Sequence, residues 1–322
     1  MTFYVIRRVF IGILLLFFMS AAFFALTRLT PGPPFSTGEN PRAHQELVDR
    51  RLHNLGLDKP WYQQYPAYLN ALVHGNLGDS YVNNVPVTTL LVQRVPNSVL
   101  LLGVSLIVSL LIAIPLGVFA ATHQYSKVDT TTSVLSYVGI SVPSFVLGIF
   151  LLLGGAVWLR HVTNGNLYFP LFGMHLNAST QDLGDLAWHM VLPVTSLAIL
   201  SVAGFSRFMR ASMLEVLHQD YVRTAKAKGL PARSVNYKHA LRNAILPIVT
   251  LVALQTPQFV SGAIITEGIF SWPGMGLLAF QAALTRDYPV ILGVVMLVAA
   301  LTILFNLLAD IAYAVVDPRI RY

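Results

Sequence analysis

The sequence predicts an all-α, polytopic membrane protein with about six transmembrane helices. Hydrophobic residues make up 55% of the 322 residues and charged residues only 11%, whereas soluble domains carry about 25% charged residues. In addition, six apolar stretches approach or exceed the length of about 20 residues that a helix needs to cross the hydrocarbon core. Backbone polar groups in lipid must bond within their own segment, so these stretches are expected to be helices.

The six stretches are separated by charged or loop residues. They run from Val9 to Thr27, Val99 to Ala121, Val134 to Leu159, Leu186 to Ser206, Asn243 to Thr266, and Tyr288 to Ala309. The first stretch has a cleaved signal peptide as its alternative. Its apolar run is longer than the roughly 7–15 residues of a signal sequence, and no clear small-residue cleavage site follows it, which favours an uncleaved anchor.

Lys and Arg are unevenly distributed over the short loops, and this imbalance predicts the orientation of the chain. On one side, the short loops hold only Arg160 and Arg286. The basic residues of the other side include Arg7, Arg8, Arg207, Arg210, Arg223, Lys226, Lys228, Arg233, Lys238, Arg242, Arg319 and Arg321. Both termini are therefore expected in the cytoplasm. The long segment after the first stretch is expected outside, since long loops cross largely regardless of charge.

Three parts follow from this topology: residues 1–29 as the cytoplasmic N-terminus and first transmembrane helix, residues 30–98 as an external segment, and residues 99–322 as the transmembrane core. The external segment is expected to be helical. Asn40-Pro41 can begin a first helix that ends at Gly56, and a second can run from near Pro60 to before Gly75. This segment can act as a cap on the bundle, as a docking surface for an external partner, or as both.

The cytoplasmic loop at about 207–242 contains a short polar helix. Asp220 is a favourable N-cap, and Gly229 followed by Pro231 is a favourable stop, with Gly229 expected in the left-handed conformation. These signals predict a helix from Tyr221 to Lys228. Ala225 lies four residues before Gly229, so the two are expected to form a notch of small residues that another protein can approach closely.

Other residues of this helix are candidates for the surrounding contact. Tyr221, Val222 and Leu230 are expected to act as anchors, and Arg223, Lys226 and Lys228 as a charged rim. The residues alone leave open a simpler interpretation, in which the basic loop only fixes the topology.

The short helix also carries a family resemblance. Residues 221–229, Tyr-Val-Arg-Thr-Ala-Lys-Ala-Lys-Gly, with Ile245-Leu-Pro247 downstream, resemble the EAA signature of permease subunits of bacterial ATP-binding-cassette importers. Arg223-Thr-Ala225 replaces the Glu-Ala-Ala triplet, a variant common in the peptide branch. Further matching fragments are Arg7-Arg8, Thr30-Pro-Gly-Pro33, Leu55-Gly-Leu-Asp-Lys-Pro60, Gly75-Asn-Leu-Gly78, Ile269-Phe-Ser-Trp-Pro-Gly274, Asp287-Tyr-Pro289 and Asp317-Pro-Arg319. This ordered series resembles the B-type permease of dipeptide, oligopeptide and nickel importers, although Pro33 stands where that branch usually has Asp.

The resemblance implies a division of labour in the bacterial cytoplasmic (inner) membrane. A second permease subunit would form a heterodimer with this chain, two cytoplasmic ATPase subunits would bind ATP and Mg, and an external substrate-binding protein would deliver peptides. The short cytoplasmic helix would insert into a groove on an ATPase subunit as a coupling helix. This chain would itself carry no cofactor, metal site or catalytic residue and would bind no nucleic acid. The absence of a G-x-x-x-x-G-K-[ST] phosphate loop from the sequence agrees with that role.

Polar residues in the fifth stretch are candidates to line the substrate pathway. Gln255, Gln258 and Ser261 are spaced three residues apart, which places them near one helix face. Hydrogen bonding between helices, without substrate contact, is the alternative role for such residues.

Other substrates and protein classes remain as alternatives. Nickel or another small solute is the alternative substrate, because in this family the external binding protein does most of the selecting. A proton-coupled carrier would be expected to bury ionisable residues in its spans. The six stretches contain His189 but no Asp, Glu, Lys or Arg, and His189 is expected to be a packed or interfacial histidine. A membrane enzyme is disfavoured, since neither a G-x-S-x-G nor a His-Glu-x-x-His motif is present.

Overall fold

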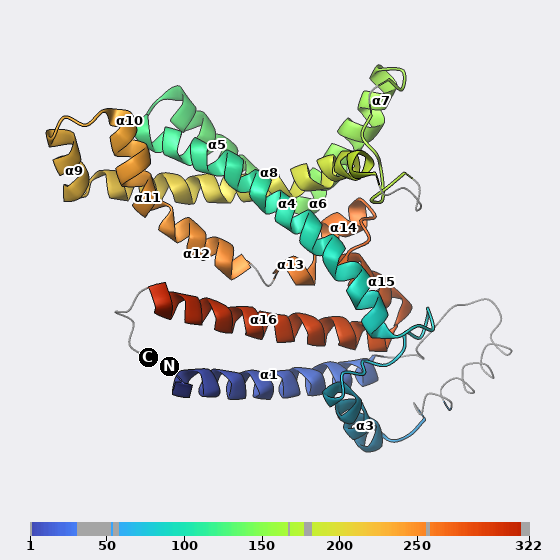
Figure 1. Cartoon of the computed structure of the whole chain (residues 1–322). Helices are drawn as coiled ribbons and strands as arrows, with labels where there is room; N and C mark the ends of the chain where they lie inside the picture. Colours follow the sequence, from blue (N-terminus) through green and yellow to red (C-terminus); the bar gives the residue numbers. More distant parts are fainter. Residues whose placement is uncertain are drawn as a thin grey trace. The chain divides into compact units, whose positions relative to one another are not determined.

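The computed structural model describes residues 2–30, 53, 58–166, 168–176, 182–255 and 258–316, with the backbone alone at 2–4 and 309–316. These residues form helices with short connections, as Figure 1 shows. They group into two compact units, one made of Met1–Asn97 with Gly274–Tyr322 and the other of Ser98–Pro273. This grouping differs from the division at residues 29 and 98, because the last long helix packs against the first.

Among its described residues, the first unit has four helices besides the beginning of α4. They are α1 (Thr2–Leu29), α3 (Trp61–Val73), α15 (Met275–Thr285) and α16 (Tyr288–Val316). Helices α1 and α16 lie side by side (Figure 1). A Cβ atom at Gly12 would lie only 2.7 Å from a side-chain carbon of Ile303, so this glycine permits their close approach. The predicted first and sixth spans and the predicted helix after Pro60 are confirmed, whereas α15 was not predicted.

The start of α16 is tied to the loop before α4 by a buried carboxylate. Asp287 is 2% exposed and accepts a hydrogen bond from the hydroxyl of Ser80. It also accepts bonds from the backbone N–H groups of Tyr81 at 2.9 Å and Val82 at 3.3 Å. The carboxylate thus accepts three hydrogen bonds from one turn, which explains an acidic residue at this buried position. The predicted helix between Asn40 and Gly56 lies outside the described residues.

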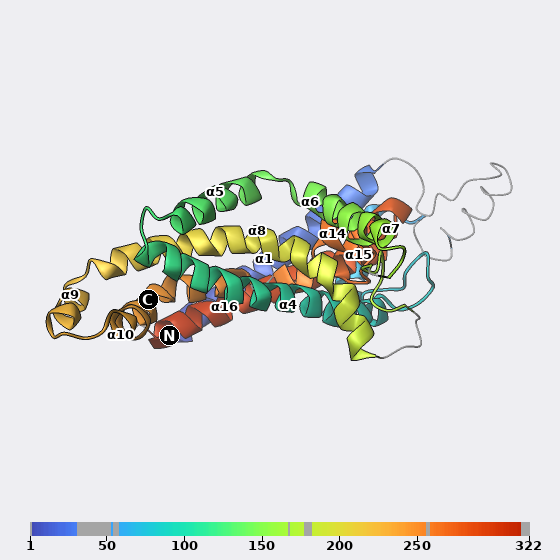
Figure 2. The same cartoon turned by 90° about the horizontal axis from the view of Figure 1, so that it is seen from above.

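The second unit is built around two long helices. Helix α4 (Val87–Thr122) enters it from the first unit, and α8 (Leu183–Leu217) runs through it with α5 packed alongside, as Figure 2 shows. The remaining elements are α5 (Lys127–Ser141), α6 (Ser144–Leu151), the π-helix η1 (Leu152–Trp158), α7 (Leu159–Val162), α9 (Asp220–Ala227), α10 (Ala232–Ser234), the π-helix η2 (Val235–Ala240), α11 (Leu241–Ala244), α12 (Leu246–Gln255), α13 (Gln258–Ser261) and α14 (Ile264–Ile269).

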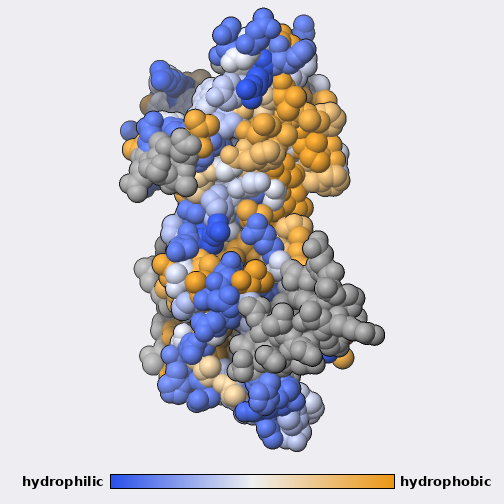
Figure 3. Space-filling view, turned by 90° about the vertical axis from the view of Figure 1, so that its right-hand side faces the viewer, coloured by the Kyte–Doolittle hydropathy of each residue, from blue (hydrophilic) through white to orange (hydrophobic). Residues whose placement is uncertain are grey.

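Six helical segments of the described chain are long and apolar enough to cross a membrane. They are Val5–Leu29, Val87–Thr122, Ser144–Val162, Leu183–Leu217, Ala232–Ser261 and Tyr288–Leu308. Many of their large hydrophobic side chains are exposed, and in Figure 3 hydrophobic residues gather toward the upper right of the face shown, beside hydrophilic ones. The prediction of about six transmembrane helices in an all-α protein is therefore confirmed.

Two predicted spans had the wrong bounds. The third, Val134 to Leu159, crosses a break, because Val142 is extended with φ −80° and ψ 123°. The ring of Pro143 disfavours a helical conformation at the residue before it, so α5 ends there and the span is Ser144–Val162. The fifth, Asn243 to Thr266, is interrupted at Gly262, which has φ +78°.

The second and fourth spans are confirmed but are parts of longer helices. Helix α4 begins at Val87 and not at Val99. Helix α8 continues to Leu217, so Arg207 and Arg210, which were expected in a loop, lie on a helix. The charged residues are accommodated by local partners: the guanidinium of Arg210 pairs with Asp129, and that of Arg207 lies 5.1 Å from the centre of the Tyr137 ring.

Candidate coupling surface and translocation pathway

Helix α9 ends as the sequence predicts but begins differently. Gly229 has φ +76°, the left-handed conformation expected at a helix stop, and its N–H donates to the carbonyl of Lys226 at 3.0 Å. Gln219, and not Asp220, occupies the N-cap position, and no side chain caps the helix. Asp220 lies in the first turn instead, where its negative charge interacts favourably with the helix dipole.

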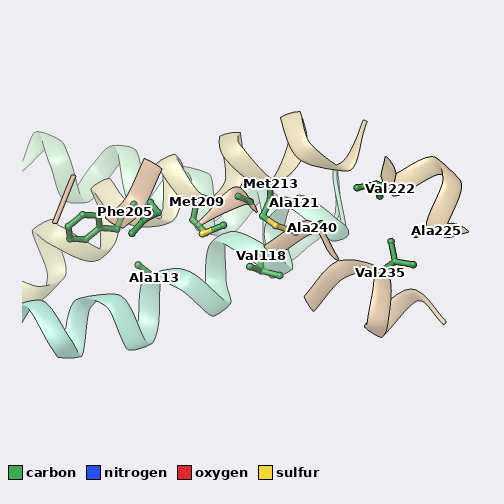
Figure 4. Close-up of a cluster of buried hydrophobic side chains, with 12 residues drawn as sticks. Ala113, Val118, Ala121, Phe205, Met209, Met213, Val222, Ala225, Val235 and Ala240 are labelled. Carbon is green, nitrogen blue, oxygen red and sulfur yellow. The ribbon is translucent and has the colours of Figure 1, made fainter. Parts of the chain in front are cut away.

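The apolar side of α9 packs into the chain's own core. Val222 is fully buried and Ala225 is 7% exposed, and both belong to a hydrophobic cluster with Met213 and Val235. Figure 4 shows this cluster between α4, α8, α9 and η2. The expectation that Val222 and Ala225 face a partner is therefore corrected. They lie three residues apart on one helix face, and that face fills a space which other segments of the same chain provide.

The opposite side of α9 is accessible. Tyr221 and Leu230 are 41% and 39% exposed, and Arg223, Lys226 and Gly229 are exposed as well. The hydroxyl oxygen of Tyr221 accepts a hydrogen bond of 2.8 Å from the side-chain amide of Asn243, which ties α9 to α11. A pocket of about 320 Å³ adjoins this surface, with Lys226, Leu230 and Asn236 in its lining. Together these residues form a basic surface on one side of α9, and the buried residues of its other side hold the helix to the rest of the chain.

A buried ion pair joins α5 to α8, the long helix that precedes α9. Asp129 of α5 is 4% exposed. Its two carboxylate oxygens accept hydrogen bonds from Nε and Nη2 of Arg210 on α8, at 2.6 and 2.9 Å. The backbone N–H of Tyr125 donates a further bond at 2.9 Å. The hydrogen bonds from Arg210 hold the pKa of the Asp129 carboxyl below its usual value. The two-point contact fixes the orientation of α5 on α8.

The three predicted pathway residues lie at the end of the span Ala232–Ser261. Gln255 is half-buried at the end of α12, whereas Gln258, which is exposed, and Ser261, which is half-buried, lie on α13. The hydroxyl of Ser261 donates to the backbone carbonyl of Gln258 at 3.1 Å. All three residues belong to the span Ala232–Ser261, which ends at the break at Gly262.

A buried acidic residue lies just beyond this break, and the sequence analysis did not single it out. Glu267 of α14 has no exposed surface. Its Oε1 accepts hydrogen bonds from the hydroxyl of Ser98 at 2.8 Å and from the backbone N–H of Ala263 at 3.0 Å. An acidic residue directly after an apolar run is a signal that could have identified it. His189 is 5% exposed and its Nδ1 lies 2.8 Å from the carbonyl oxygen of Asp185, as expected for a packed histidine.

Comparison with known families accounts for this arrangement of helices. Residues 113–322 match the family described as "binding-protein-dependent transport system inner membrane component". Residues 1–103 match the corresponding N-terminal family. The chain belongs to this family. It is therefore an inner-membrane permease that crosses the membrane several times, and the predicted resemblance is confirmed.

Curated relatives match the permease over nearly its whole length. The oligopeptide transport system permease protein AppB of Bacillus subtilis is 39% identical over 99% of both chains. The dipeptide transport system permease protein DppB of Escherichia coli K12 is 40% identical over 97% of this chain and 95% of its own. The permease also resembles a chain of the inward-facing methionine ABC transporter MetNI, with a TM-score of 0.55, 16% identity, and coverage of 71% of this chain and 97% of that chain. This last similarity concerns the fold alone.

Proposed function

We propose that this permease translocates peptides as one subunit of an ATP-binding-cassette importer. The observation that carries the proposal is full-length similarity to permeases named for oligopeptide and dipeptide transport. Its partners would be a second permease subunit in a heterodimer, two cytoplasmic ATPase subunits and an external substrate-binding protein. ATP and Mg would be bound by the ATPase subunits and not by this chain.

The exposed side of α9 is the proposed contact with an ATPase subunit. Tyr221 and Leu230 supply apolar contact area, while Arg223 and Lys226 supply positive charge. Val222 and Ala225 have an indirect role in this proposal, because they anchor α9 to the helices that must move. A helix that is held firmly by its own chain can transmit a force, whereas a loosely attached loop cannot.

The proposed orientation places α9 and both termini in the cytoplasm and α3 outside. The chain has no native cysteine, so single-cysteine variants report topology directly. A cysteine at Lys228 should react from the cytoplasmic side, and one at Val73, which is 83% exposed in α3, should react from outside. The reverse pattern would contradict the orientation.

The proposed pathway passes the polar residues around the interrupted helix, namely Gln255, Gln258 and Ser261. Bulky apolar replacements there should lower peptide uptake while the complex still assembles. Wild-type uptake by all three variants would assign these residues to packing.

The decisive experiment is peptide uptake into proteoliposomes that contain the purified complex. A labelled tripeptide should accumulate only with ATP on the ATPase side and binding protein on the other, and collapse of the proton gradient should have no effect. Uptake driven by a proton gradient without ATP would overturn the proposal in favour of a secondary carrier. Uptake of Ni²⁺ but not of the peptide would assign nickel, and not peptides, as the substrate.

A pair of variants at Gly229 tests the coupling surface. Gly229→Asn keeps the left-handed conformation accessible, whereas Gly229→Glu adds backbone strain and a negative charge to a basic surface. Pull-down of the ATPase subunits should survive the first change and fail with the second. Equal retention of the ATPase subunits by both variants would contradict the assigned surface.

A further inference from the structure

The interruption after α13 lies between a segment with several exposed apolar side chains and a turn whose side chains are buried. Leu246, Val249 and Leu254 of α12 are all more than half exposed. Directly after the break, Ile264 and Ile265 are still about half exposed, but Glu267 and Trp272 have no exposed surface. Gly262, with φ +78°, therefore lies just before the point where the chain becomes buried.

Several helices hold α14 and the turn that follows it. A Cβ atom at Gly148 of α6 would lie 3.0 Å from Cδ1 of Ile269, so these elements are in close contact. Phe270 packs in a cluster with residues of η1 and α8, and Trp272 packs with Leu101 of α4 and residues of α8. The segment after the break is therefore an integral part of the core of the second unit.

The side chain of Glu267 links this core to the break through hydrogen bonds. Its Oε1 receives the hydroxyl hydrogen bond of Ser98 on α4 and the backbone N–H bond of Ala263, the residue next to Gly262. Ala263 occupies the N-cap of α14 with φ −105° and ψ 78°. A buried backbone N–H at an interrupted helix needs such an acceptor, because no preceding turn supplies one.

We propose that Glu267 is a positioning residue of the translocation pathway, which clamps Ala263 to α4 so that α12 and α13 move about Gly262 against a fixed point. The inference rests on the proposed function, since it assigns the moving side to the segment with Gln255 and Gln258. Without the clamp, movement of α12 and α13 would spread into α14 and would be lost for transport. Gly262 suits the joint because a residue without a side chain adopts positive φ without strain.

The test compares Glu267→Ala with Glu267→Gln, which retains an oxygen at the acceptor position. Peptide uptake per ATP hydrolysed should fall about tenfold in Glu267→Ala, the effect of losing a charge-assisted hydrogen bond, and by less than about twofold in Glu267→Gln. Ser98→Ala, which removes one donor, should lie between them. Thr266→Val is the matched control, because Thr266 is 3% exposed in the same helix and shows no bond to Ser98 among the described residues.

A second measurement does not depend on transport. Amide hydrogen exchange at Ala263 should become about tenfold faster in Glu267→Ala but not in Glu267→Gln or Thr266→Val. Unchanged exchange in Glu267→Ala overturns the clamp, even if the wild-type complex transports no peptide and the proposed function fails. With a wild-type complex that transports peptide, three outcomes overturn the inference alone: wild-type coupling in Glu267→Ala, equal losses in Glu267→Ala and Glu267→Gln, or an equal loss in Thr266→Val.

Discussion

The short helices α9 and α14 of the second unit have opposite polarity. Helix α9 buries Val222 and Ala225 and exposes the charged side chain of Arg223. Helix α14 buries the carboxylate of Glu267, while Ile265 is 50% exposed. One helix is apolar inside and polar outside, and the other is the reverse, although both are packed against the same long helix α8.

This difference indicates different surroundings. An outward charged face is stable in water, which agrees with the proposed cytoplasmic position of α9. An outward isoleucine face with a hydrogen-bonded carboxylate behind it is expected where lipid or another subunit covers the helix. Polarity of the exposed side, and not helix length, therefore distinguishes a soluble contact surface from a membrane segment in this chain.

The largest expected effect comes from reversing the polarity of α9. Val222→Asp would bury a carboxylate without a partner and should lower the free energy of unfolding by about 3 kcal/mol or more. Thr224→Asp, on the exposed side of the same helix, should change it by about 0.5 kcal/mol. Thermal unfolding of the purified chain in detergent measures both. Similar midpoints for the two variants would show that α9 does not depend on its buried side.

Loss of the ion pair behind α9 should have the next largest effect. Arg210→Met leaves the buried carboxylate of Asp129 without its cation and should destabilise the chain by about 2 kcal/mol, reduced from the value for a fully buried pair because the Arg210 side chain is 29% exposed. The double variant with Asp129→Leu should recover part of the loss. A double variant that is less stable than Arg210→Met would contradict this account.

The same pair predicts a dependence on acid. Because the pKa of Asp129 is lowered from 3.8 in the folded chain, its contribution to stability is fully present above about pH 4 and is lost as the pH falls through the lowered pKa. Asp129→Asn should remove this part of the acid sensitivity. Stability curves of the wild type and Asp129→Asn that run parallel below pH 4 would exclude the pair as its source.

The smallest expected effect is at the exposed face of α14. Ile265→Ser should change the stability of the isolated chain in detergent by less than about 0.5 kcal/mol, because Ile265 is already half exposed. If another subunit covers this face, the same variant should weaken assembly with the second permease. Normal assembly of this variant would indicate that lipid, and not another subunit, covers the exposed face of α14. The difference between this face and the charged face of α9 would then be one between lipid and water.

The α9 segment shows how far local signals extend. Gly229 and Pro231 predicted the helix end, and the structure confirms the left-handed Gly229. The charged residues around it predicted a polar surface, and Arg223 and Lys226 are exposed. Which side is buried could not be predicted, because Val222 and Ala225 are buried by Met213 and Val235. The sequence does not reveal that α8, η2 and the distant α4 meet on this side of α9.

The interrupted fifth span shows the opposite case. Asn243 to Thr266 is apolar enough to be taken for one continuous helix, and hydropathy contains no signal for the break at Gly262. Glu267 was overlooked for the same reason, since its burial depends on a hydroxyl from Ser98 that lies 169 residues earlier. Gln255, Gln258 and Ser261 therefore lie in the last turns before that break.

The sequence by itself determined the membrane class, the number of spans and the existence of α9. Apolar length and loop charge can be read directly along the chain, and a left-handed glycine ends a helix locally. Only the tertiary structure decided the break at Gly262, the buried side of α9 and the role of Glu267 as a hydrogen-bond acceptor. The buried side of α9 depends on residues of α4, and the bond to Glu267 depends on Ser98, which lies 169 residues earlier. In both cases an apolar face or a polar group is satisfied by a segment that lies elsewhere in the chain.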